Sequence, residues 1–208
     1  VREGLPHGRP SLFPAPAPFV CGAAARVRCA LMRPPTEGRL IRLRAREPED
    51  VPVLHAWAQD PDTIRFNESR YPPSLQAMRP RAELHPTYDH ARLAVVDRES
   101  GALVGDVALH TMDPESRSGF IGLLIGPEHR GRGYGTDATR AICRFGFDMM
   151  NLNRVELDVI ASNERALHVY AKAGFRVEGR RRACYYHAGA YEDFIMMGML
   201  RGELTEEG

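Results

Sequence analysis

The sequence predicts a single α/β domain with a mixed, mostly antiparallel central sheet and helices on both faces. Three observations predict this fold class. The length of 208 residues suits one domain, and the 43% hydrophobic content suits an ordinary core. Strand-like alternation recurs in four segments up to residue 125, and helix-like and strand-like segments alternate after it. We place the domain at residues 36–208, and no internal repeat is visible.

The first 35 residues differ in composition from the rest of the chain. They hold seven of the 16 prolines and five arginines but a single acid, Glu3, and they show no helical or strand periodicity. Such a segment cannot build a hydrophobic core. We therefore expect a disordered extension, or a start codon assigned upstream of Met32, with an Arg-rich transit peptide as the alternative.

The domain is expected to begin with a strand and a helix. Residues Leu40–Arg44 alternate between apolar and basic side chains, which predicts a strand with one wet face. Residues Glu47–Trp57 follow with apolar side chains at helical spacing, and acids in the first turn favour the helix dipole. The proline-rich stretch from Asp60 to Pro86 indicates short helices and loops.

Three strands then form an antiparallel meander, at Ala91–Asp97, Leu103–Thr111 and Ser118–Ile125. The turn between the first two contains Gly101, a residue typical of turns.

The second half of the domain alternates helices with strands. Residues Gly133–Met150 place apolar side chains on one helical face, which must pack against the sheet. A strand at Val155–Val159 and a short helix at Asn163–Ala173 come next, and Gly174 is suited to end that helix. Two closing strands are expected at 175–187 and 191–200.

Composition and residue spacing exclude several classes of protein. The 28 basic residues balance 27 acidic ones, so the strongly cationic surface that nucleic acid requires is not expected. Apolar runs are too short to span a membrane. The four cysteines form no CxxC pair, and Cys143 fits a buried thiol, so we expect a reduced, cytoplasmic protein. The histidines show no metal-ligand spacing, so no metal is expected.

The most informative segment is a glycine-rich loop between a predicted strand and the long helix. Gly131, Gly133 and Gly135 allow the backbone to approach a ligand closely and to adopt positive φ. Free amides at the start of the following helix favour phosphate oxygens, and Arg130 and Arg132 add positive charge. The loop therefore predicts an anion site.

A dinucleotide-binding site is an alternative interpretation of this loop. Residues Gly133–Ala138 fit the pattern G-x-G-x-x-A, and Glu156 and Asp158 lie about 20 residues onward. In a dinucleotide fold, however, the first glycine directly ends its strand, whereas several residues separate Ile125 from Gly133 here. There is also no GxxxxGK[ST] run, so a P-loop nucleotidase is not expected.

Two motifs in their context resemble the GNAT superfamily of acetyl-coenzyme A-dependent N-acetyltransferases. Residues Arg130–Gly135 match the loop [Q/R]-x-x-G-x-[G/A], which stands between a strand and a helix. Downstream, Asn163 is followed by Tyr170 and then by Gly174 and Phe175, as in the family's helix beside the thiol end of the cofactor. The resemblance covers about residues 38–203 and is closest to the ribosomal-protein N-terminal alanine acetyltransferase branch.

The resemblance implies a binding site for acetyl-coenzyme A. The pyrophosphate would lie on the amides of the glycine loop, and the pantetheine arm would run along the preceding strand as an extra strand and contact Asn163. A side-chain cap at the start of its own helix is the other role open to Asn163. The implied cofactor-binding residues are Leu123, Leu124, Ile125, Arg130, Gly131, Arg132, Gly133, Tyr134, Gly135, Thr136 and Asn163.

The resemblance also implies catalytic residues. Tyr170 is the candidate general acid for the departing thiolate, with a packed core tyrosine as the alternative. Asp158 and Glu156 share one face of a central strand and are candidate general bases, with salt bridges to arginine as the alternative. Many relatives carry a Glu where this chain has Phe120, so a base at that position is not expected, and deprotonation through water stays open.

Together these features predict an acyltransferase that moves an acetyl group to a primary amine by direct attack, without an acyl-enzyme. Both a protein amino terminus and a small amine stay open as the acceptor of the acetyl group. A homodimer stays open as the state of assembly. The alternative functions are a non-catalytic acyl-coenzyme A sensor, a dinucleotide-binding protein and a protein-interaction module.

Overall fold

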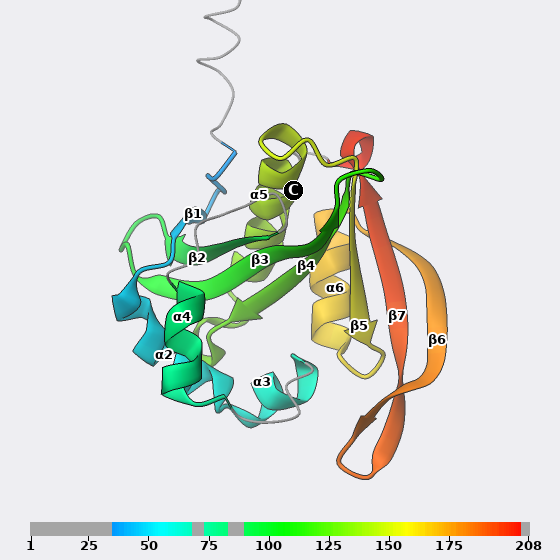
Figure 1. The fold of residues 1–208 in the computed structure, drawn as a ribbon, viewed down its shortest axis with the longest axis horizontal. Helices are drawn as coiled ribbons and strands as arrows, with labels where there is room; N and C mark the ends of the chain where they lie inside the picture. The colour runs from blue at the N-terminus through cyan, green and yellow to red at the C-terminus, as the bar shows by residue number, and fades with distance from the viewer. Residues whose placement is uncertain (1–34, 68–72, 83–89, 205–208) are drawn as a thin grey trace, which may run out of the picture. The chain divides into compact units, whose positions relative to one another are not determined.

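A seven-stranded sheet forms the centre of the domain in the computed structural model, which describes residues 35–67, 73–82 and 90–204 (Figure 1). The expectation for residues 1–35 therefore falls almost wholly outside the described part. The strand order is β1-β2-β3-β4-β5-β7-β6, and every neighbouring pair is antiparallel except β4 and β5. The predicted fold class is confirmed. The strands are β1 (Ile41–Ala45), β2 (Ala91–Asp97), β3 (Leu103–Asp113), β4 (Ser118–Ile125), β5 (Arg154–Ile160), β6 (Arg176–His187) and β7 (Ala190–Leu200).

Helices lie on both faces of this sheet, as Figure 1 shows for α4 in front of β3 and α5 behind it. The predicted helix from Glu47 begins instead as a single 3-10 turn, η1 (Pro48–Asp50), which leads directly into α2. The α-helices are α2 (Val51–Ala58), α3 (Pro61–Phe66), α4 (Leu75–Ala82), α5 (Tyr134–Asp148) and α6 (Glu164–Ala173), and two further 3-10 turns are η2 (Pro127–His129) and η3 (Arg201–Glu203).

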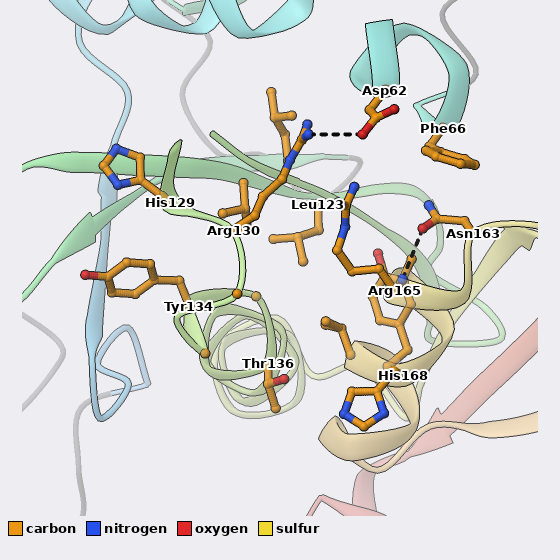
Figure 2. A pocket seen from close by; sticks show the side chains of 18 of the residues that line it. Asp62, Phe66, Leu123, His129, Arg130, Tyr134, Thr136, Asn163, Arg165 and His168 are labelled. Atoms are coloured by element: carbon orange, nitrogen blue, oxygen red, sulfur yellow. Dashed lines mark hydrogen bonds and ion pairs between the residues drawn. The ribbon is translucent and has the colours of Figure 1, made fainter. Parts of the chain in front are cut away.

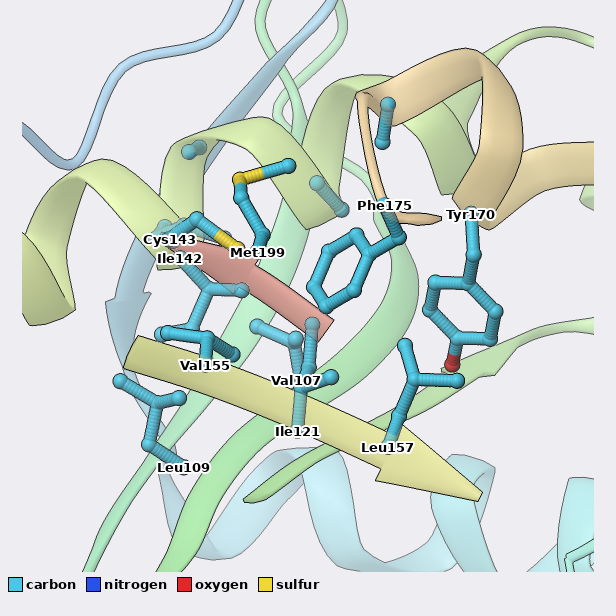
Figure 3. Packing of buried hydrophobic residues seen from close by; sticks show 14 of the residues in the cluster. Val107, Leu109, Ile121, Ile142, Cys143, Val155, Leu157, Tyr170, Phe175 and Met199 are labelled. Atoms are coloured by element: carbon cyan, nitrogen blue, oxygen red, sulfur yellow. The ribbon is translucent and has the colours of Figure 1, made fainter. Parts of the chain in front are cut away.

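The main hydrophobic core fills the space between one face of the sheet and helices α5 and α6 (Figure 3). Ile142 and Cys143 of α5 are fully buried there, with Leu109 of β3 and Val155 of β5. This packing explains the apolar face of the long helix, since each buried aliphatic side chain contributes about 1.5–3 kcal/mol. The opposite face is also covered, because Ala94 alternates away from this cluster and is fully buried too.

The parallel pair β4–β5 is short and then separates. Only Ser118–Phe120 of β4 pair with β5, whereas residues 121–125 pair with β3 alone. Figure 1 shows the two strands diverging as a V from this point. Beyond Phe120, the edge of β4 that faces β5 therefore has no strand partner among the described residues. This edge is open to a ligand that pairs with it as a strand does.

Asp137 in the first turn of α5 fixes the helix to the beginning of β1. Its carboxylate accepts hydrogen bonds from the backbone N–H groups of Arg39, Leu40 and Ile41, at 2.9, 2.6 and 3.1 Å. Gly38 lies so close that an added Cβ would stand 2.3 Å from an oxygen of this carboxylate. The start of α5, and with it the glycine loop, is therefore held by an edge strand almost 100 residues earlier.

Asp137→Ala is expected to lower the free energy of unfolding by about 2–4 kcal/mol, because three backbone donors lose a charged acceptor. Urea unfolding followed by circular dichroism measures the change. Asp148→Ala is the matched control, since Asp148 is exposed at the other end of the same helix. Equal losses in the two variants would contradict the role given to Asp137.

Candidate active site

A cavity of about 410 Å³ lies where β4 and β5 separate, beside the start of α5 (Figure 2). All of the predicted cofactor-binding residues line it except Arg132, which is exposed. The cavity thus brings together residues that are up to 40 positions apart in the sequence. The predicted residues that line it are Leu123, Leu124, Ile125, Arg130, Gly131, Gly133, Tyr134, Gly135, Thr136 and Asn163.

The glycine loop presents unused amide groups to this cavity. Gly131 and Gly133 adopt φ values of +77° and +86°, which turn the chain sharply before α5 begins. The backbone N–H groups of residues 131–136 donate no hydrogen bond to any part of the chain that the structure describes, and the helical ladder begins with the N–H of Asp137. A cluster of free amides at a helix N-terminus is suited to phosphate oxygens.

Arg130 joins the glycine loop to α3. Its guanidinium lies 2.9 Å from Asp60, the N-cap residue of α3, and 3.6 Å from Asp62, and it also donates to the Thr63 hydroxyl. Figure 2 shows the contact with Asp62 at the rim of the cavity. Two carboxylates thus share the charge that Arg130 was expected to offer to a phosphate, and these contacts connect the loop to α3.

The loop is also held from α2 and β2. The Trp57 indole N–H donates to Glu128 at 3.0 Å, and an added Cβ at Gly126 would stand 2.5 Å from the indole ring. The Tyr134 hydroxyl donates to Asp97 at 2.8 Å. Hydrogen bonds from Ser100, and then the one from Tyr134, lower the pKa of Asp97 to about 2, so Asp97 remains an ionised acceptor at physiological pH.

Helix α6 supplies cationic side chains that sequence analysis missed. Arg165 and Lys172 line the cavity and add positive charge to it, and His168 lines it as well. Figure 2 shows Arg165 and His168 on α6, across the cavity from the glycine loop. Their spacing of three and four residues places them on one face of a helix, so helical periodicity could have found them. Asn163 acts as the N-cap of this helix by accepting from the N–H of Ala166 at 3.1 Å, which confirms the cap role that sequence analysis left open.

A second cavity of about 590 Å³ adjoins the first and is more polar. The two share Phe66, Asn67, Leu123, Leu124 and Tyr170 as lining residues, so they meet at the diverging end of β4. Sequence analysis did not single out the polar residues of the second cavity, although strand alternation places several of them on one sheet face. Its charged and titratable lining residues are Arg46, Arg92, Asp106, His110, Asp158 and Tyr170.

Asp106 and two arginines form a buried ion cluster at one end of the second cavity. Its carboxylate lies 3.3 Å from Arg46 and 3.7 Å from Arg92, and Asp106 is only 9% exposed. Burial raises the pKa of Asp106, and both arginines oppose that shift. Arg46 directly follows β1, Arg92 lies on β2 and Asp106 lies on β3, so this cluster links three neighbouring strands at one end of the cavity.

Tyr170 lies at the boundary between the two cavities. It is 7% exposed, and its ring packs against Phe175 with centroids 5.7 Å apart. Figure 3 shows this ring at the border of the core, beside Leu157. Burial raises the pKa of Tyr170, so the phenol stays protonated. Tyr170 is therefore both a packed core residue and a neutral O–H group at the junction.

The two candidate bases on β5 are both engaged in ion pairs. Asp158 lines the second cavity and pairs with Arg181 of β6. Glu156 lies 3.2 Å from Arg154, which also pairs with Glu178, and it lines neither cavity. The salt bridges that sequence analysis kept as the alternative are present at both positions, and only Asp158 lies where an acceptor could reach it.

The remaining candidate groups add little to the site. Within residues 35–67, 73–82 and 90–204, no group of three or more His, Cys, Asp or Glu side chains could hold a metal ion. In the same ranges, no helix is long and apolar enough to cross a membrane. Cys143 is a buried free thiol, as expected, and Cys184 is an exposed one, whereas Cys21 and Cys29 lie outside the described residues.

The fold with these features is that of the GNAT acetyltransferases. The model of the acetyltransferase (GNAT) domain matches residues 40–176, and the chain belongs to this family. It is therefore an N-acetyltransferase that uses acetyl-coenzyme A as co-substrate.

Several relatives are similar over most of the chain. Spermidine N(1)-acetyltransferase of Escherichia coli K12 is 28% identical over 170 residues, which are 80% of this chain and 89% of that protein. A putative ribosomal N-acetyltransferase of Bacillus subtilis is 33% identical over 107 residues, 51% of this chain and 58% of that protein. The crystal structure of spermidine N-acetyltransferase from Vibrio cholerae with CoA and spermine has a TM-score of 0.72 and 26% identity, covering 79% of this chain and 97% of that one.

Proposed function

We propose that the first cavity binds acetyl-coenzyme A and that the second binds a small primary amine, which attacks the thioester directly. One observation carries this proposal: the two cavities meet at Leu123, Leu124 and Tyr170. A pantetheine arm paired with the open edge of β4 would deliver its thioester to that junction. The amides of residues 131–136 would hold the pyrophosphate at the other end of the arm.

Each step of the transfer has a group available. The amine nitrogen attacks the carbonyl carbon, and the open amides of β4 are suited to the developing oxyanion, where one donor contributes about 3–4 kcal/mol. The carbon–sulfur bond then breaks, and the departing thiolate takes a proton from the Tyr170 hydroxyl. Tyr170 regains a proton from solvent. A cationic amine must lose one proton to a base or to water before it can attack, and a second proton to solvent as the amide forms.

A small amine is favoured over a protein amino terminus as the acceptor. The relatives named for spermidine match about 80% of this chain. The relative named as a putative ribosomal enzyme supports the ribosomal branch, but it matches only 51% of this chain. The second cavity, however, offers no excess negative charge to a polyamine, because Asp106 is paired with Arg46 and Arg92, and Asp158 is paired with Arg181. We therefore propose an acceptor with a single cationic amine.

Ligand-dependent melting and thiol release test this function. Acetyl-coenzyme A is expected to raise the melting temperature and NADH to leave it unchanged. Free thiol is expected to appear with small monoamines, at a higher kcat/KM than with spermidine or a peptide with a free amino-terminal alanine. Stabilisation without thiol release from any amine would indicate an acyl-coenzyme A sensor instead. Stabilisation by NADH alone would indicate a dinucleotide-binding protein, and a response to neither ligand would indicate an interaction module.

A further inference from the structure

The proposed reaction leaves the acceptor of the amine proton unassigned, and the second cavity holds few groups that could take it. Its arginines are permanently charged, and Asp106 is held between two of them. Asp158 is paired with Arg181, and Tyr170 remains protonated. The one other titratable side chain among the described lining residues is His110.

His110 lies on β3 with its ring against β4. It is in register with Phe120, and the two rings stack with centroids 6.3 Å apart and planes 23° apart. Gly122, two residues further along β4, also lines the cavity, and an added Cβ there would stand 3.6 Å from Nε2 of His110. The absence of a side chain at Gly122 therefore leaves Nε2 uncovered. This nitrogen has no hydrogen-bond partner within the described residues.

The other ring nitrogen has a partner in an unusual conformation. Nδ1 of His110 lies 3.0 Å from the Thr111 hydroxyl oxygen. Thr111 has a φ of +49°, a left-handed conformation that is strained for a β-branched residue, and it begins the irregularity between His110 and Asp113 in the β3–β4 pairing. Strain of this kind persists only where surrounding structure enforces it, and here it places a hydroxyl against the imidazole.

We propose that His110 is the general base of the reaction, with its Nδ1–H donated to the Thr111 hydroxyl and its Nε2 lone pair directed into the second cavity. This inference rests on the proposed acetyl transfer and assigns its missing proton acceptor. Nε2 takes one proton from the cationic amine, and the neutral nitrogen then attacks the carbonyl carbon. The second nitrogen proton passes to solvent as the tetrahedral adduct collapses. After the carbon–sulfur bond breaks and Tyr170 protonates the thiolate, the imidazolium returns its proton to solvent.

The charges around His110 favour the neutral imidazole that this role requires. Burial lowers the pKa of His110, and the nearby Arg92 and His90 of the β2 region lower it further. The carboxylates of the same cavity, Asp106 and Asp158, are each paired with arginine. With its pKa below the usual value of about 6.5, His110 is neutral at pH 7 and becomes inactive as a base when the pH falls through its pKa.

The pH dependence of kcat/KM tests the assignment, using the amine that gives the highest thiol release. In the wild type, kcat/KM is expected to fall at acid pH as His110 becomes protonated. His110→Gln should lower kcat/KM by about 100-fold or more and abolish this acid limb, without changing the affinity for acetyl-coenzyme A. His187→Gln is the matched control, because His187 lines neither cavity, and it should keep the wild-type profile. Asp158→Asn should keep the acid limb as well.

Nitrogen-15 NMR of the imidazole gives a second readout that does not depend on turnover. The wild type should show a proton on Nδ1 and none on Nε2, and Thr111→Ala should yield a mixture of tautomers. A wild-type proton on Nε2, or an unchanged acid limb in His110→Gln, would overturn the base assignment and leave the acetyltransferase intact. Absence of thiol release by the wild type with every amine would instead overturn the proposed transfer itself.

Discussion

Tyr170→Phe is expected to lower kcat by about 100-fold to 10,000-fold, the usual contribution of a positioned general acid. The variant loses one hydroxyl, and it retains the ring that packs against Phe175. The cost to folding should therefore be small. The cost to catalysis should be large, because the departing thiolate of coenzyme A has no other described O–H donor at the junction of the two cavities.

The measurement separates chemistry from binding. Turnover with the best amine gives kcat, and titration calorimetry with coenzyme A gives an affinity that should stay within about twofold of wild type, since the phosphates bind elsewhere. Tyr185→Phe is the matched control, because Tyr185 is also a buried tyrosine with an aromatic neighbour, Phe194, but lines neither cavity. Full activity in Tyr170→Phe would remove the acid role and leave Tyr170 as a core residue.

Local patterns predicted the elements of this fold because each depends on neighbouring residues. The strands Ala91–Asp97 and Ser118–Ile125 have the predicted bounds, since alternation of apolar side chains sets a strand directly. The predicted start of the helix at Glu47 was less accurate, because Pro48–Asp50 form a tighter 3-10 turn there. The glycine loop was found because its residue types are unusual for an ordinary turn and stand between a strand and a helix.

Features that depend on distant segments could not be predicted in the same way. No local pattern shows that β4 leaves β5 after Phe120, although this divergence creates both cavities. The ion pair of Asp158 depends on Arg181 of another strand, and that of Arg130 depends on α3. Sequence analysis could offer a salt bridge and a catalytic role for Asp158 as equal alternatives, and only the fold shows that an arginine is within reach.

The strain at Thr111 is a further example of information that the sequence lacks. A threonine at the end of a strand is ordinary in composition, and its positive φ arises from the irregular pairing of β3 with β4. His110 was accordingly one of several scattered histidines with no metal-ligand spacing. Its stacking on Phe120 and the space at Gly122 become visible only when the two strands are paired.

Gly131→Asp is expected to weaken the binding of acetyl-coenzyme A by about 100-fold. A carboxylate at this position would face the pyrophosphate, and two unit charges about 5 Å apart repel by about 3 kcal/mol near a protein surface. Steric conflict is not the cause, because an added Cβ at Gly131 meets no atom within 4 Å. The loss should shrink at high salt, which screens the repulsion.

Gly189→Asp separates this electrostatic effect from backbone strain. Gly189 has a φ of +87°, close to the +77° of Gly131, and an added Cβ there also meets nothing within 4 Å. It lies in the turn between β6 and β7 and lines neither cavity. Both variants therefore carry the same strain and the same new charge, and calorimetric titration should show weakened binding for Gly131→Asp alone. Equal affinity in the two variants would mean that the phosphates bind away from the glycine loop, because a carboxylate among amides that hold a pyrophosphate cannot be neutral in its effect.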